Sequence, residues 1–164
     1  MKPALLIIDV QKAFFGDPIT TQSLNNAVET INAAIALFRE KQLPVISVQH
    51  VDENNSLVPG EERFELPDEL DVLPSDLHIH KTYGNSFNKT PLENELRKLG
   101  VDTVIVTGFC AEYCVLAAHQ GALDVDLTPI VLRGALASST PENIAFVERI
   151  TNMISYQALE KVLE

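Results

Sequence analysis

Short apolar runs alternate with helical patterns along most of this chain. Residues 4–10 (ALLIIDV) form a nearly continuous apolar run, which is typical of a parallel strand buried on both faces. Further short runs predict strands at 45–51, 77–80, 102–107 and 127–132. We therefore expect five strands, most of them followed by a segment that lacks the apolar run of a strand.

Helical signals occupy most of the segments between these strands. Apolar residues recur at intervals of three and four over 23–41, and Pro91 is suited to the first turn of a later helix. Gly100 is typical of the left-handed residue that ends a helix. Residues 113–123 and the region that begins at Pro141 complete the predicted helical set.

Strand–helix alternation over 164 residues is typical of one α/β domain. We predict a three-layer α/β/α sandwich with a mainly parallel central sheet, formed by residues 1–164 as a single domain. In such a sheet, ligands bind beyond the carboxyl ends of the strands, so we expect the functional side chains to lie there.

The segment 52–76 shows neither the apolar run of a strand nor the periodicity of a helix. It is long for a connection inside a compact domain, and it holds nine acidic side chains against Arg63 alone. We expect it to act as a lid that lines part of the active-site mouth, where its negative charge would disfavour anionic substrates.

Net charge and cysteine content narrow the function classes. The formal charge of −11 repels phosphate backbones and anionic lipid headgroups, so we expect neither nucleic acid nor membrane as a partner. Two cysteines cannot form a disulfide framework, and the apolar run near Met1 is too short for a signal peptide or a span. These features predict a cytoplasmic domain that acts on a small molecule.

Three reactive side chains follow predicted strands. Asp9 lies at the end of the first strand, Lys81 follows the third, and Cys114 lies about one helical turn beyond the fourth. Asp9 is either a general acid/base or a helix-cap or turn residue. Cys114 is either a nucleophile, whose thiolate the helix start and Lys81 would favour, or a buried structural cysteine.

A structural zinc site is not expected. Cys110 and Cys114 form a Cys-x3-Cys pair, but no third Cys or His follows at a supporting spacing. His119 lies five residues beyond Cys114, and His78 and His80 alternate on one face of a strand. We expect no metal and no other cofactor.

Three segments resemble one known family. Residues 6–14 (LIIDVQKAF), 81–87 (KTYGNSF) and 106–115 (VTGFCAEYCV) are similar to the opening, lysine and nucleophile motifs of the isochorismatase-like cysteine hydrolases, which include nicotinamidases. The three motifs occur in the family's order. The resemblance implies the α/β/α fold and the hydrolysis of a small carboxamide or a related C–N bond without a cofactor.

The resemblance also implies a catalytic triad of Cys114, Asp9 and Lys81. In that chemistry the thiolate attacks an amide carbonyl and forms a thioester, which water then hydrolyses. Asp9 takes the thiol proton and passes it to the leaving amine, and Lys81 holds the carboxylate in place. On this basis iodoacetamide should label Cys114 before Cys110.

Pocket residues are implied by the same motifs. The family implies a cis peptide bond at Phe109–Cys110, which would place the backbone N–H of Cys110 beside that of Cys114 as an oxyanion hole. Gln11, Phe14 and Phe109 match positions that line or support the substrate pocket. Family members commonly self-associate, so we expect a homodimer or a higher homo-oligomer.

Departures from the family pattern leave alternatives open. Residues 49–52 (QHVD) stand where nicotinamidases carry an Asp-x-His metal motif, so a metal-assisted nicotinamidase is not expected. Vinyl-ether hydrolysis of an isochorismate-like substrate would need Asp9 but not Cys114. The other alternative is a non-catalytic binding module, because residues 119–121 and 133–134 also depart from the family.

Overall fold

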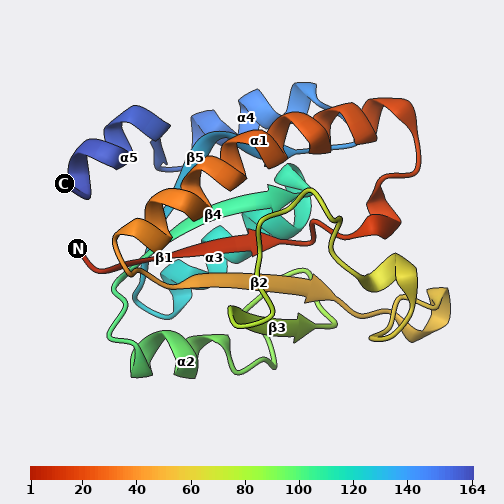
Figure 1. The fold of residues 1–164 in the computed structure, drawn as a ribbon, viewed down its shortest axis with the longest axis horizontal. Coiled ribbons are helices and arrows are strands. Elements are labelled where there is room, and N and C mark those ends of the chain that lie inside the picture. Colours follow the sequence, from red (N-terminus) through yellow and green to blue (C-terminus); the bar gives the residue numbers. More distant parts are fainter.

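The computed structural model describes all of residues 1–164 and contains one six-stranded sheet (Figure 1). Every neighbouring pair of strands is parallel, and the order across the sheet is β3-β2-β1-β4-β5-β6. The strands are β1 (Pro3–Ile8), β2 (Val45–His50), β3 (Leu77–Lys81), β4 (Thr103–Phe109), β5 (Thr128–Ala137) and β6 (Met153–Ile154). The predicted fold class is confirmed; β6, which was not predicted, is too short to show a periodic pattern.

Five helices cover the two faces of the sheet. They are α1 (Pro18–Glu40), α2 (Leu92–Lys98), α3 (Leu116–Asp124), α4 (Glu142–Ile150) and α5 (Tyr156–Val162). Helix α1 begins earlier than predicted because the Asp17 side chain accepts a hydrogen bond from the N–H of Thr20 and Pro18 occupies the first turn. The predicted final helical region is divided into α4, β6 and α5.

Side chains of β1 alternate between two hydrophobic cores. Leu5 and Ile7 pack on the side of α1 and of Leu159 in α5, whereas Leu6 and Ile8 pack on the side of α2, α3 and α4. All four β1 side chains are buried. The continuous apolar run therefore reflects a strand that lies between two helical layers.

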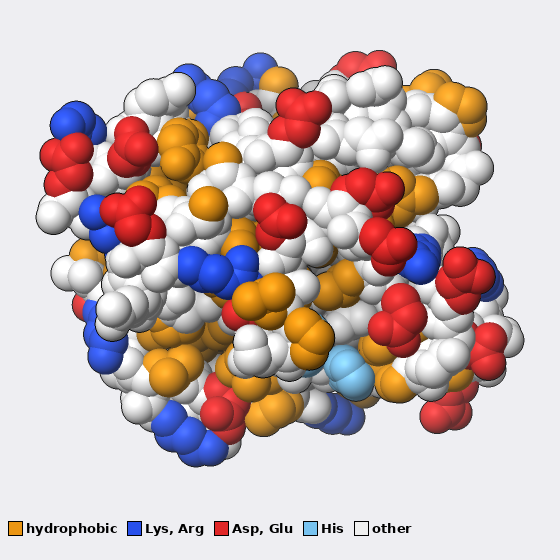
Figure 2. All heavy atoms as spheres, viewed as in Figure 1, with side chains coloured by type: hydrophobic (Ala, Val, Ile, Leu, Met, Phe, Trp, Pro, Cys, Tyr) orange, Lys and Arg blue, Asp and Glu red, His pale blue; other side chains and the backbone are white.

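The acidic segment 52–76 lies between β2 and β3 and contains two short 3-10 turns, Glu53–Asn55 and Glu62–Phe64. The backbone N–H of Lys12 donates to the carbonyl oxygen of Glu65, which ties the segment to the chain just beyond β1. Much of it lies beyond the carboxyl ends of β1 and β2 (Figure 1), and Figure 2 shows several acidic side chains over that end of the molecule. None of the helices combines the length and the apolar character that a membrane span requires.

Candidate active site

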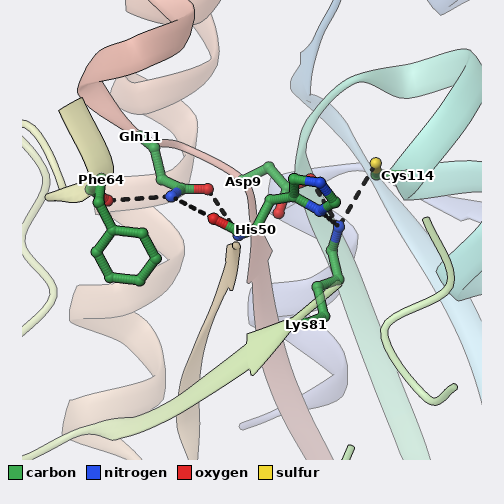
Figure 3. A network of polar contacts seen from close by, with 6 residues as sticks. All are labelled: Asp9, Gln11, His50, Phe64, Lys81 and Cys114. Atoms are coloured by element: carbon green, nitrogen blue, oxygen red, sulfur yellow. Dashed lines mark hydrogen bonds and ion pairs between the residues drawn. The ribbon is translucent and has the colours of Figure 1, made fainter. Parts of the chain in front are cut away.

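Asp9, Lys81 and Cys114 come together at the carboxyl edge of the sheet (Figure 3). Asp9 directly follows β1, Lys81 ends β3, and Cys114 lies in a π-helical turn, Ala111–Val115, between β4 and α3. The Nζ of Lys81 lies 2.9 Å from Oδ2 of Asp9 and 3.6 Å from Sγ of Cys114. The structure thus brings the three side chains singled out in the sequence into one cluster.

A glycine at position 108 permits this arrangement. Gly108 pairs with Ile8 across β4 and β1 and has a φ of +114°. A β-carbon at this position would collide with the carbonyl oxygen of Ile8, so the backbone of β4 approaches β1 this closely only with glycine. The close approach positions the turn that carries Cys114 near Asp9.

The ammonium group of Lys81 has three protons and three acceptors. Besides Asp9 and Cys114, its Nζ contacts Nδ1 of His50 at 3.2 Å. Lys81 is 1% exposed and Asp9 is 2% exposed, so the ion pair is almost completely shielded from water. Each donor of the buried ammonium group is therefore satisfied by the protein itself.

The carboxyl group of Asp9 is suited to accept a proton. Burial raises the pKa of Asp9 above its ordinary value, although the charge of Lys81 opposes the shift. Its second oxygen, Oδ1, is buried and has no hydrogen-bond partner. A carboxylate with a raised pKa is a stronger base than an exposed one, so this group provides a base within the cluster.

The surroundings of Cys114 favour a thiol, although the sequence suggested that the helix start and Lys81 would favour a thiolate. Burial and the negative charge of Asp9 raise the pKa of Cys114 to about 12, and Lys81 offsets them only in part. Regular α-helix begins at Leu116, beyond the cysteine, so Cys114 lies in the widened turn and not within α3. Cys114 is therefore a thiol that needs a base before it can act as a nucleophile.

Cys110 lies just before the same turn. Its peptide bond with Phe109 is cis, and its Sγ lies 3.7 Å from Oγ of Ser138. Burial raises the pKa of the Cys110 thiol to about 11. The backbone N–H of Cys110 donates no hydrogen bond within the chain, which leaves this donor available to a ligand.

A cavity of about 400 Å³ opens onto the cluster. Asp9, His50 and Cys114 form part of its wall, together with the rings of Phe14 and Phe109, whose centroids lie 4.9 Å apart. Phe14 and Phe109 therefore lie where the sequence motifs place them. A cavity of this size with a few polar groups and an aromatic wall suits a small ligand.

Gln11 does not line the cavity, but it contacts His50, which does, so it supports the wall and does not form it. Its Nε2 donates to the carbonyl oxygens of His50 and Phe64, each at 3.0 Å, and its Oε1 accepts from the N–H of His50 at 2.7 Å (Figure 3). These bonds join the ends of β1 and β2 to the acidic segment. No residue of 52–76 lines the cavity, so the predicted lid is not part of its wall.

Several cavity residues were missed in the sequence analysis. His50 ends β2, so the rule that selected Asp9 and Lys81 could also have found it; burial and the charge of Lys81 lower the pKa of its imidazole. Other wall residues come from the turn after β4, the β5–α4 connection and the start of α4: Glu112, Tyr113, Ser139, Thr140 and Asn143. No group of three or more His, Cys, Asp or Glu side chains is arranged to hold a metal ion.

The fold is an α/β/α sandwich whose parallel sheet carries the cluster of Asp9, Lys81 and Cys114 at its carboxyl edge. The chain belongs to the isochorismatase family, since the Isochorismatase domain matches residues 3–156. It is 36% identical, over 70% of its length, to the uncharacterized isochorismatase family protein YrdC of Bacillus subtilis strain 168. The matched region spans 62% of that relative.

Solved structures have the same fold. An isochorismatase-like hydrolase from Alkaliphilus metalliredigens has a TM-score of 0.91 at 22% identity, and the match covers 100% of both chains. The N-carbamoylsarcosine amidase from Thermoplasma acidophilum has a TM-score of 0.81 at 27% identity, and the match covers 94% of this chain and 95% of that one. The family inferred from the three sequence motifs is thereby confirmed.

Proposed function

We propose that this protein hydrolyses small carboxamides or related C–N bonds and that Cys114 is the nucleophile. The main support is one juxtaposition: a thiol at a small cavity lies 3.6 Å from an ammonium group that also pairs with the buried Asp9. Attack of a thiol on a carbonyl needs a base, and Asp9 is the carboxylate of this cluster. The similarity to a structure named an amidase supports the same class of bond.

In the first half-reaction, Asp9 removes the thiol proton as the sulfur of Cys114 attacks the carbonyl carbon of the bound amide. We place the developing oxyanion against the backbone N–H groups of Cys110 and Cys114. Asp9 then gives its proton to the leaving nitrogen, and ammonia or an amine departs. In the second half-reaction, Asp9 activates a water molecule that hydrolyses the thioester.

Lys81 would balance the charge throughout this cycle. In the resting protein the negative charge lies on Asp9, because the pKa of the Cys114 thiol is raised to about 12. Proton transfer moves the charge from the carboxylate to the sulfur. The ammonium group lies 2.9 Å from the first and 3.6 Å from the second, so it stabilises the charge in both positions.

Ammonia release from a panel of small carboxamides tests this proposal. We expect turnover by the unmodified protein and none above background for Cys114→Ala. Cys110→Ala is the matched control, because it removes a thiol but keeps the backbone N–H assigned to the oxyanion, and it should retain turnover. Acid quenching followed by mass spectrometry should detect an acyl group on Cys114. Full activity of Cys114→Ala would refute the proposed nucleophile, and a lack of ammonia release by the unmodified protein would favour the vinyl-ether alternative.

A further inference from the structure

Glu112 is a second carboxylate in the cavity wall, and the proposed cycle does not use it. It lies in the same π-helical turn as Cys114, two residues earlier, and both residues line the cavity. The Oγ of Ser138 lies 2.9 and 2.8 Å from the two carboxylate oxygens, and Nδ2 of Asn143 donates to Oε1 at 3.0 Å. These neutral partners hold the carboxylate in a defined position.

The carboxylate of Glu112 has no cationic partner within the chain, since it belongs to none of the ion pairs. Partial burial would raise the pKa of Glu112, but hydrogen bonds from Asn143 and Ser138 outweigh burial and lower it. Glu112 is therefore ionised at neutral pH, and its charge is met only by neutral dipoles.

The other ionisable groups at the cavity do not compensate this carboxylate. Asp9 is paired with Lys81. Burial and the charge of Lys81 lower the pKa of His50, so its imidazole is neutral at pH 7. Raised pKa values keep the thiols of Cys110 and Cys114 protonated. One uncompensated negative charge is thus left in the wall of a small cavity, close in the chain to the reactive sulfur.

We propose that Glu112 is a specificity-determining residue that binds a cationic group, an ammonium or a guanidinium, on a small carboxamide whose carbonyl lies at Cys114. A hydrogen bond between charged partners, partly shielded from water, changes affinity by about 10- to 100-fold. Anionic amides are excluded by the same carboxylate. The carboxamide part of this inference rests on the proposed function, whereas the charge preference of the cavity does not.

Charged thiol reagents test the preference without any amide hydrolysis. In a methanethiosulfonate, the cysteine sulfur attacks the sulfenyl sulfur, a disulfide forms, methanesulfinate leaves and the thiol proton passes to a base. Reagents with a trimethylammonium or a sulfonate group give a cation-to-anion rate ratio at Cys114, which peptide mass spectrometry separates from Cys110. Glu112→Gln should lower this ratio by about 10- to 100-fold. The control Glu142→Gln removes the same charge from an exposed position and should change the ratio by less than about twofold.

Matched amides test the same preference in turnover. β-Alaninamide carries an ammonium group where butyramide carries a methyl group, so the two differ mainly in charge. The unmodified protein should prefer β-alaninamide in kcat/KM by about 10- to 100-fold, and Glu112→Gln should lose this preference through a higher KM with little change in kcat. Glu112→Asp and Glu112→Asn shorten the side chain equally, so only the first should retain part of the preference.

The possible outcomes separate this inference from the proposed function. An unchanged cation-to-anion ratio in Glu112→Gln overturns the role of Glu112, even in a protein that hydrolyses amides. A ratio that falls as expected in a protein that hydrolyses no amide supports the charge preference and refutes the proposed function. Failure of every reagent to modify Cys114 overturns both, because it shows that ligands do not reach the sulfur. If Glu112→Gln fails to fold, the ratio between Glu112→Asp and Glu112→Asn decides the question.

Discussion

Lys81→Met removes the ammonium group and leaves Asp9 as an uncompensated buried carboxylate. Asp9 is 2% exposed and loses the partner that lies 2.9 Å away. Breaking a buried ion pair by removing one partner destabilises by about 3–5 kcal/mol. Folded domains have a total stability of about 5–15 kcal/mol, so this is a large loss. At about 2–4 °C per kcal/mol for a chain of this size, the unfolding temperature at pH 8 should fall by roughly 6–20 °C.

The loss of stability caused by Lys81→Met should be larger at high pH than at low pH. Burial raises the pKa of Asp9 even with Lys81 present, and Lys81 is the main influence that lowers it, so the pKa in the variant is higher still. The folded state then binds the proton of Asp9 more tightly than the unfolded state. Stability is therefore retained below the ordinary value of 3.8 and is lost as the pH rises through the folded pKa. The variant should lie closer to the unmodified protein at pH 5 than at pH 8.

Guanidinium unfolding at both pH values measures this effect for Lys81→Met, Asp9→Asn and the double variant. The double variant removes both charges and should recover most of the stability, because replacing both members of a buried pair is often neutral or stabilising. A loss in Lys81→Met below about 1 kcal/mol, which is the value of an exposed pair, and equal at both pH values would refute the reasoning. Such a result would mean that water reaches the pair.

Gln11, Gly121 and Asp9 each provide a further test. Gln11→Met should speed tryptic cleavage after Arg63, because it removes the buried hydrogen bond to the carbonyl oxygen of Phe64 in the acidic segment and two more to His50; an unchanged cleavage rate would contradict this. Gly121→Ala should lower stability by about 1–3 kcal/mol in thermal unfolding, because its β-carbon would collide with the Asn85 side chain; a gain in stability would argue against that contact. If amide hydrolysis is found, its kcat/KM should decrease as the pH falls through the raised pKa of Asp9, and a flat profile would exclude Asp9 as the base.

Strand ends made the cluster of Asp9, Lys81 and Cys114 predictable from the sequence. Asp9 and Lys81 lie 72 positions apart, yet each follows an apolar run, and parallel strands place all their carboxyl ends at one edge. The same rule covers the turn that holds Cys114. It also covers His50, which was passed over because it was read only as a departure from a metal motif. Position along the chain was therefore sufficient to place these groups at one edge.

The chemical state of the groups was not predictable in this way. The ionisation of Cys114 is set by burial and by Asp9, which lies far away in the sequence. The direction of the Gln11 side chain depends on acceptors in β2 and in the acidic segment. The exposure of Glu112 to the cavity depends on the β5–α4 connection, which supplies Ser138. Each of these properties arises from contacts that form only on folding, so local sequence patterns carry no signal for them.

Stability alone does not account for the buried pair of Asp9 and Lys81. An apolar pair of similar volume would serve the fold as well or better, since two buried charges lose their hydration. One oxygen of Asp9 is buried without a partner, whereas the neighbouring Gln11 has both polar atoms of its side chain hydrogen-bonded. An unsatisfied carboxylate oxygen is unfavourable for folding, but it is what a group needs if it is to accept a proton. The combination of a buried charge pair, a free lone pair and a protonated Cys114 at one cavity is therefore better explained by proton transfer than by packing.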